Sequence, residues 1–170
     1  SAAFARTDAM RNICAPLFEN PVMPSPSDCY DYAVAQKTKA ACDGLIAAGG
    51  QNWKEHCDIN AGLVSDAALS VKPTKLHECV MTKVSKTGAA VSGSVAGGSA
   101  IEYLNGVRQV SAKQIDQVDF AKAGDIVRVC FKGASDCSKG RFTGNVYDAN
   151  NISGGYSWHL SDSVEVCAGR

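Results

Sequence analysis

The sequence predicts an α+β protein in which an N-terminal helical hairpin region precedes a C-terminal antiparallel β-sheet, with disulfides stabilising the fold. Three observations predict this class: helical periodicity in the N-terminal part, strand-like alternation after residue 100, and 8 cysteines spread along the chain. We expect a single domain over residues 1–170. The alternative is a helical part at 1–84, a Gly/Ser-rich connection at 85–100 and a β part at 101–170.

Helical signals dominate the N-terminal part. The stretch "FARTDAMRNICA", residues 4–15, predicts a short helix that ends before the proline that follows it. The clearest helix is expected at roughly 29–47, where Asp28 is a good N-cap and Gly49-Gly50 terminate the apolar periodicity. These signals place Cys29 at the first helical position.

A further helix is expected over "NWKEHCDINAGLVSDAALS", with a break near its glycine. The Gly-Gly turn before it would make an antiparallel helical hairpin with the helix at 29–47. In that hairpin Cys42 and Cys57 could face each other, so we take them as the first candidate disulfide pair.

Strand signals dominate the C-terminal part. In "AIEYLNGVRQVS" two β-prone runs flank Asn105-Gly106, a pair that favours a two-residue hairpin turn. The runs "GDIVRVCFKG", "GRFTGNVYDA" and "GYSWHLSDSVEVC" predict further antiparallel strands. Between the Asn105-Gly106 hairpin and the run "GDIVRVCFKG", Ser111 and Gln114 form a capping-box pattern that predicts a short helix through about Lys122.

The stretch "SKTGAAVSGSVAGGSA", residues 85–100, is small, polar and rich in glycine. It is compatible with a linker or with a thin strand in a glycine-rich sheet.

The cysteines indicate an oxidising compartment. Their number is even, they are dispersed, and no CxxC pair occurs, so the patterns of zinc ribbons and thioredoxins are missing. We therefore expect four disulfides in a protein that is secreted, at the cell surface or periplasmic; buried free thiols in a cytosolic protein are the alternative. A Cys130–Cys137 bridge would clip a hairpin, because these residues flank the turn "KGASD". The cysteines are Cys14, Cys29, Cys42, Cys57, Cys79, Cys130, Cys137 and Cys167.

The charge balance excludes an electrostatic argument for nucleic acid. Lysine plus arginine number 17 and aspartate plus glutamate 17, so the formal net charge is zero. No apolar run approaches the roughly 18 to 20 residues that a membrane-spanning helix needs. We expect neither nucleic acid as a partner nor a membrane-spanning segment in this chain.

Cys29 raises the question of nucleophilic catalysis. A thiol at a helix N-terminus is activated by the helix dipole and the unsatisfied N–H groups. With His159 arriving later on a strand, the layout resembles papain-like enzymes, including the bacterial amidases that cut peptidoglycan; "KAGDIVRV" also resembles their "PGD" strand opening. The resemblance implies a Cys/His hydrolase acting on cell-wall peptides, with Cys29 as nucleophile and His159 as base.

The chain departs from that family at Tyr30-Asp31, where Ser-Gly or Trp follows the family's cysteine. We expect a disulfide at Cys29 and keep the hydrolase as the alternative.

Two His–Cys groups could in principle ligate zinc. "KEHC" and "LHEC" supply His56, Cys57, His77 and Cys79. Adjacent side chains on a helix diverge by about 100°, so a neighbouring His and Cys cannot both reach one ion without distortion. We expect no metal and no cofactor.

Aromatic side chains form the candidate binding surface. Tyr147, Tyr156 and Trp158 lie on the predicted strands and could form a recognition patch for a protein or glycan partner. The alternation of the last strand also permits the opposite outcome, with Trp158 in the core and His159 exposed.

"AFARTDAM", residues 3–10, resembles type IV pilins where their long N-terminal helix leaves the membrane segment. The pilin resemblance implies a filament subunit with a C-terminal sheet and a disulfide near the C-terminus, which Cys167 would suit. The chain departs from it where Cys14-Ala15-Pro16 stops the helix early.

Our leading expectation is a non-enzymatic extracytoplasmic binding or structural module: a surface-filament or pilin-like subunit, an adhesin-like domain, a secreted effector or a periplasmic inhibitor. We also keep self-assembly as an alternative, in which the partner is a second copy of this chain.

Overall fold

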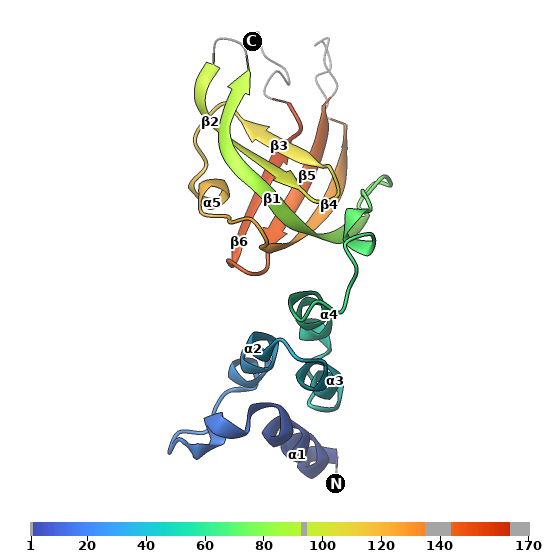
Figure 1. Cartoon of the computed structure of the whole chain (residues 1–170), viewed down its shortest axis with the longest axis vertical. Coiled ribbons are helices and arrows are strands. Elements are labelled where there is room, and N and C mark those ends of the chain that lie inside the picture. Colours follow the sequence, from blue (N-terminus) through green and yellow to red (C-terminus); the bar gives the residue numbers. More distant parts are fainter. Residues whose placement is uncertain (1, 93–94, 135–143, 164–170) are drawn as a thin grey trace. The chain divides into compact units, whose positions relative to one another are not determined.

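The structure is a computed structural model that describes residues 2–92, 95–134 and 144–163. The chain divides into two compact units, residues 1–65 and 66–170. Helices build the first unit, and a closed antiparallel barrel forms the second (Figure 1). The protein is therefore α+β and disulfide-stabilised, as expected.

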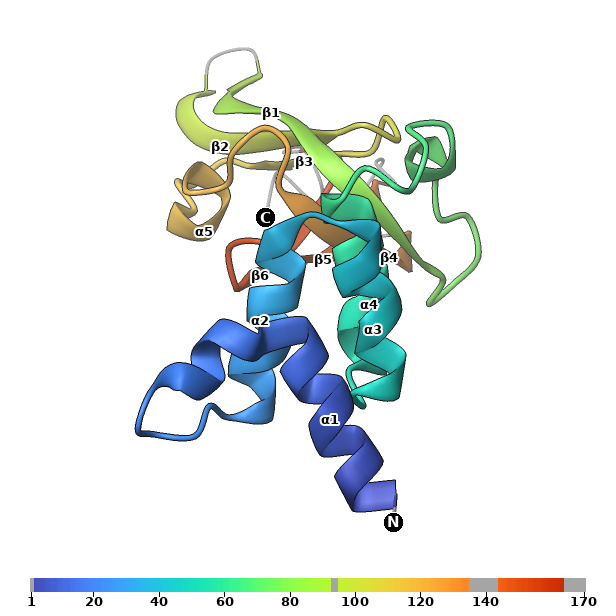
Figure 2. The same cartoon turned by 60° about the horizontal axis from the view of Figure 1, so that its bottom comes forward.

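The helices of the first unit are grouped together (Figure 2), and their buried side chains form a small apolar core. Leu45, Ala33 and Tyr30 are among its buried residues, and the Tyr30 ring packs against Trp53 with 4.7 Å between ring centroids. The elements are α1 (Ala2–Cys14), the 3-10 helix η1 (Ala15–Glu19), α2 (Pro26–Gln36), α3 (Lys39–Ala47) and α4 (Gln51–Asn60).

The helix expected at 29–47 is two helices in the structure. Lys37 adopts the left-handed conformation with φ 56°, which ends α2. Thr38 then caps α3, because its hydroxyl accepts a hydrogen bond from the Ala41 N–H at 3.2 Å. The apolar spacing continues across this break, which is why periodicity alone predicted one helix.

The N-cap of α2 is Ser25 and not Asp28. The Ser25 hydroxyl accepts from the Asp28 N–H at 3.2 Å, and the Asp28 carboxylate accepts from the Ser25 N–H at 3.0 Å. These reciprocal bonds form a capping box. Since α2 begins at Pro26, Cys29 is the fourth helical residue and not the first, and its N–H donates to the Ser25 carbonyl at 3.2 Å.

The second unit is a closed barrel where an antiparallel sheet was expected. In the described part of the chain its strands are ordered β1-β2-β3-β6-β5-β4, and β4 pairs back onto β1 (Figure 1). The one-turn helix α5 (Asp116–Asp119) and the 3-10 helix η2 (Ala68–Ser70) accompany it. The strands are β1 (Cys79–Ser92), β2 (Val95–Tyr103), β3 (Arg108–Ser111), β4 (Ile126–Ala134), β5 (Asn145–Asn151) and β6 (Tyr156–Ser161).

Within the stretch 85–100, residues 85–92 belong to β1 and residues 95–100 to β2, and the two strands pair with each other, as the strand interpretation expected. A Cβ added at Gly98 would lie 1.9 Å from the Ser111 carbonyl oxygen, so a glycine is needed where β2 approaches β3. The hairpin at Asn105-Gly106 is also confirmed, although its loop has three residues, because the Tyr103 N–H donates to the Val107 carbonyl at 3.0 Å.

The helix expected after Ser111 is shorter than predicted. Ser111 ends β3, and α5 covers only Asp116–Asp119. Its Val118 is 0% exposed and joins the barrel core, which explains why this single turn forms where it does.

Two strand pairings close the barrel. Strands β1 and β4 pair along residues 79–83 and 126–130. Strands β3 and β6, by contrast, pair through the single register pair Val110–Ser161 within the described residues. Within the described residues, the β1–β4 pairing is therefore more extensive than the β3–β6 pairing.

Candidate binding surface

Side chains from three strands form a hydrogen-bonded network inside the barrel. The Trp158 indole N–H donates to the Tyr103 hydroxyl at 3.1 Å and to the Gln109 Oε1 at 3.0 Å. The Tyr103 hydroxyl also donates to the Gln109 Oε1 at 2.5 Å, and burial raises the pKa of Tyr103. The Gln109 amide nitrogen donates to the carbonyls of Tyr147 and Leu160 at 2.7 and 3.0 Å. The indole therefore belongs to the core, as the core interpretation of Trp158 expected.

Tyr147 is also a core residue. Its side chain is 7% exposed, and its ring packs on Phe131 with 5.6 Å between ring centroids. Burial raises the pKa of Tyr147, and the nearby Asp162 carboxylate adds to the shift. The expected patch of Tyr147, Tyr156 and Trp158 is therefore wrong as a surface, because two of its three rings face the barrel interior.

An exposed aromatic pair takes the place of that patch. Tyr156 is 43% exposed and Phe120 is 62% exposed, with their ring centroids 6.1 Å apart and the rings tilted by 48°. Phe120 follows α5, whose Val118 is anchored in the core, and Tyr156 begins β6 after Gly155 at φ 79°. Sequence reasoning missed Phe120, because it lies in a short irregular segment where no period assigns a face.

The outer face of β4, β5 and β6 carries a polar cluster. The carboxylate of Asp148 bonds the ring Nδ1 of His159, which is its register partner, and lies 3.5 Å from the Lys132 ammonium. Partial burial opposes ionisation, but the His159 and Lys132 interactions prevail and hold the pKa of Asp148 below its usual value. The cluster borders a shallow hollow of about 400 Å³ that also touches Arg128 and Cys130.

Cys29 has no thiol in this structure. It forms a disulfide with Cys14, and both residues are 0% exposed. His159 lies in the other unit and is paired with Asp148. The structure therefore does not support the Cys29–His159 hydrolase, because its nucleophile is oxidised and buried.

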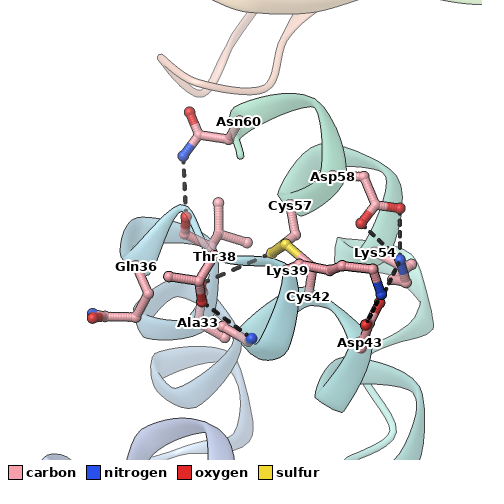
Figure 3. Close-up of a disulfide and its surroundings, with 12 residues drawn as sticks. Ala33, Gln36, Thr38, Lys39, Cys42, Asp43, Lys54, Cys57, Asp58 and Asn60 are labelled. Atoms are coloured by element: carbon pink, nitrogen blue, oxygen red, sulfur yellow. Dashed lines mark hydrogen bonds and ion pairs between the residues drawn. A yellow bond between two sulfur atoms is a disulfide. The ribbon is translucent and has the colours of Figure 1, made fainter. Parts of the chain in front are cut away.

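The expected pair Cys42–Cys57 is confirmed. The bridge joins α3 to α4 and is fully buried, and Figure 3 shows it beside the Ala33 carbonyl of α2. Lys54 ties the same helices together, since its ammonium bonds Asp58 at 2.6 Å and lies 3.8 Å from Asp43.

The third described disulfide joins Cys79 to Cys130. The expected Cys130–Cys137 bridge is therefore wrong, because Cys130 already has a partner across the strand pairing. Cys137 and Cys167 lie outside the described residues. The zinc set also fails, because Cys57 and Cys79 are both oxidised; no group of three metal-ligating side chains occurs in the described ranges.

The helical unit carries an apolar groove of about 750 Å³ between α2 and the segment that precedes it. Val22 and Met23 on its wall are 77% and 68% exposed. Its carboxylates are engaged, because Asp28 caps α2 and Asp31 accepts from the Trp53 indole N–H at 3.2 Å. The groove therefore offers mainly apolar contact.

Comparison with known proteins adds no relative: no family model, curated protein or solved structure matches the chain. No helix among the described residues is long and apolar enough to cross a membrane.

Proposed function

We propose that the chain is an extracytoplasmic, non-enzymatic binding module that contacts a protein or glycan partner through the exposed pair Phe120–Tyr156. The observation that supports the proposal is the exposure of two adjacent large rings, 62% and 43%, in a barrel whose Tyr103, Tyr147 and Trp158 are buried. A partner that covers both rings removes apolar area from water, which favours association. Two tilted rings also suit stacking against a flat apolar surface or a sugar ring.

The disulfides support the proposed extracytoplasmic location. Two of the three described bridges are fully buried within the helical unit, and such structural disulfides persist in oxidising compartments. A secreted, cell-surface or periplasmic protein fits this chemistry.

Different roles use the pair differently. An adhesin-like domain, a secreted effector or a periplasmic inhibitor would place the rings against another molecule. A filament subunit would place them against another copy of the chain. The hydrolase alternative is not proposed, because Cys29 is held in a disulfide.

The test compares a Phe120→Ala/Tyr156→Ala variant with the native chain. We expect the variant to fold normally, since both side chains are exposed, and to lose affinity about tenfold or more, because buried aromatic contacts dominate interfaces. The control is Val71→Ala, which removes another exposed apolar side chain, 56% exposed, from the same unit.

Sedimentation with peptidoglycan, chitin and cellulose measures glycan binding, and analytical ultracentrifugation measures self-association. Binding or self-association that the double variant loses and the control keeps would support the proposal. A double variant that binds these glycans or self-associates as the native chain does would contradict it.

A further inference from the structure

The Cys79–Cys130 disulfide differs from the other two in its accessibility. All four cysteines of the helical unit are 0% exposed. Cys79, by contrast, is exposed and Cys130 is partly exposed. A thiol in solution can therefore reach this bridge in the native barrel, whereas the buried bridges need local unfolding first.

The strand register explains the exposure. Cys79 and Cys130 are directly opposite each other on β1 and β4, with 4.0 Å between their Cα atoms. The Phe131 N–H donates to the Glu78 carbonyl at 2.9 Å, which is the bond that flanks a non-hydrogen-bonded pair. Since Val129 faces the core at 0% exposure, its neighbour Cys130 points to the outer face.

The surroundings of Cys130 are rich in cations. Arg128 lies two residues before Cys130 on β4, so the two side chains share the outer face. Lys132 lies at the irregularity between Phe131 and Gly133, and its ammonium is on the outer face because it lies 3.5 Å from the Asp148 carboxylate. Asp148 is opposite Cys130 on β5, but its carboxylate is paired with the Lys132 ammonium at 3.5 Å, so Arg128 and Lys132 together exceed it by one positive charge. The hollow of about 400 Å³ borders Cys130 and Arg128, so a thiolate displaced at Cys130 has open space and a cation beside it.

We propose that the Cys79–Cys130 disulfide is a thiol-exchange site, at which a small anionic thiol attacks Cys79 Sγ and displaces Cys130 as a thiolate. Cys79 is the attacked atom because it is the more exposed of the two. Arg128 and Lys132 stabilise the departing Cys130 thiolate, and the net positive charge around the bridge raises the local concentration of an anionic thiol.

The exchange balances as a two-electron reduction. The attacking sulfur forms a bond to Cys79 Sγ, and the electron pair of the broken S–S bond leaves on Cys130 Sγ. A second thiol attacks the mixed disulfide, releases Cys79 and becomes one half of the oxidised thiol. The two protons lost by the attacking thiols are taken up by the two cysteine thiolates.

The test is limited reduction of the native chain with glutathione, followed by alkylation and peptide mapping. We expect Cys79 and Cys130 to be labelled at least about tenfold faster than the four cysteines of the helical unit, because those need an opening step. Cys137 and Cys167 are read on their own peptides and do not enter the comparison. Equal rates for all three bridges, or faster labelling of the helical unit, would overturn the proposal.

A second measurement tests the role of charge. In an Arg128→Gln/Lys132→Gln variant we expect exchange with anionic glutathione to slow about threefold or more, while exchange with cationic cysteamine is less affected. A Lys113→Gln/Lys122→Gln variant, which removes two exposed cations elsewhere in the barrel unit, is the matched control. If both variants react with glutathione at the native rate, an anionic thiol is not the preferred reactant and the assignment fails.

Discussion

At the scale of single residues, Gln109 holds more of the barrel together than its size suggests. Its side chain accepts from Tyr103 and Trp158 and donates to two backbone carbonyls on β5 and β6. It is 0% exposed, so water cannot replace these partners. Its two amide donors also reach across the β3–β6 pairing, where the backbone contributes only the pair Val110–Ser161 within the described residues.

Gln109→Leu should therefore destabilise the barrel by about 2 to 4 kcal/mol, because it leaves buried donors and acceptors without partners. Chemical denaturation followed by Trp158 fluorescence, in a Trp53→Phe background, measures the free energy of unfolding. The same substitution at the exposed Gln114 is the control and should change stability little. Equal effects at both positions would show that the network contributes nothing.

Asp148 provides a second prediction at this scale. Its pKa is lower in the folded chain than in the unfolded one, so ionised Asp148 stabilises the barrel above the unfolded pKa of about 3.9. That contribution is lost as the pH falls from about 4 through the lower folded pKa. His159→Gln removes one of the groups that stabilise the carboxylate, and the pKa of Asp148 should rise toward its ordinary value. An NMR titration of the side-chain carboxyl carbon measures this; Ser157→Ala, on the same face of β6, should leave the value unchanged.

At the scale of elements, the cap of α2 is a local stabilising device. Ser25→Ala removes the hydroxyl that accepts from the Asp28 N–H and should cost about 1 kcal/mol of helical-unit stability. Thermal unfolding followed by circular dichroism at the helix minimum measures the loss. Gln51→Ala, an exposed position at the start of α4, is the control and should not lower the transition temperature.

Elements were predicted best where a local pattern determines them. The helix ending at Cys14, the hairpin at Asn105-Gly106 and the opposite faces of Trp158 and His159 all follow from periodicity or turn chemistry. The break between α2 and α3 could not be predicted in this way, because Lys37 adopts the left-handed conformation at a position where the sequence has no glycine to signal it.

Local sequence patterns could not predict that the sheet closes into a barrel. Alternation shows which side chains share a face of a strand, but the pairings that make one face the interior are long-range. This is why Tyr147 was expected at the surface and is buried, and why Phe120, in an aperiodic segment, was missed. The Cys42–Cys57 pair was predictable because a short turn joins its two helices.

At the scale of the whole molecule, the chain consists of two units with separate cores and separate disulfides. Each unit also contains one of the 2 tryptophans, Trp53 or Trp158. Two cores that share no disulfide are expected to unfold in separate transitions. Circular dichroism of the helices and Trp158 fluorescence in a Trp53→Phe background should report different midpoints, and Cys42→Ser/Cys57→Ser should move only the first. Coincident midpoints that move together would contradict this expectation.

The Cys79–Cys130 bridge also affects how the barrel can form. It joins residues separated by 51 positions, and in the chain-entropy model closing such a loop in advance is worth roughly 4 kcal/mol. An oxidised chain therefore starts folding with β1 and β4 already held near each other, and the β3–β6 pairing is left as the main long-range search. A reduced chain must find both. The oxidation state of one surface bridge thus sets the order in which the barrel closes, and with it the time during which unpaired strand edges are exposed to other chains.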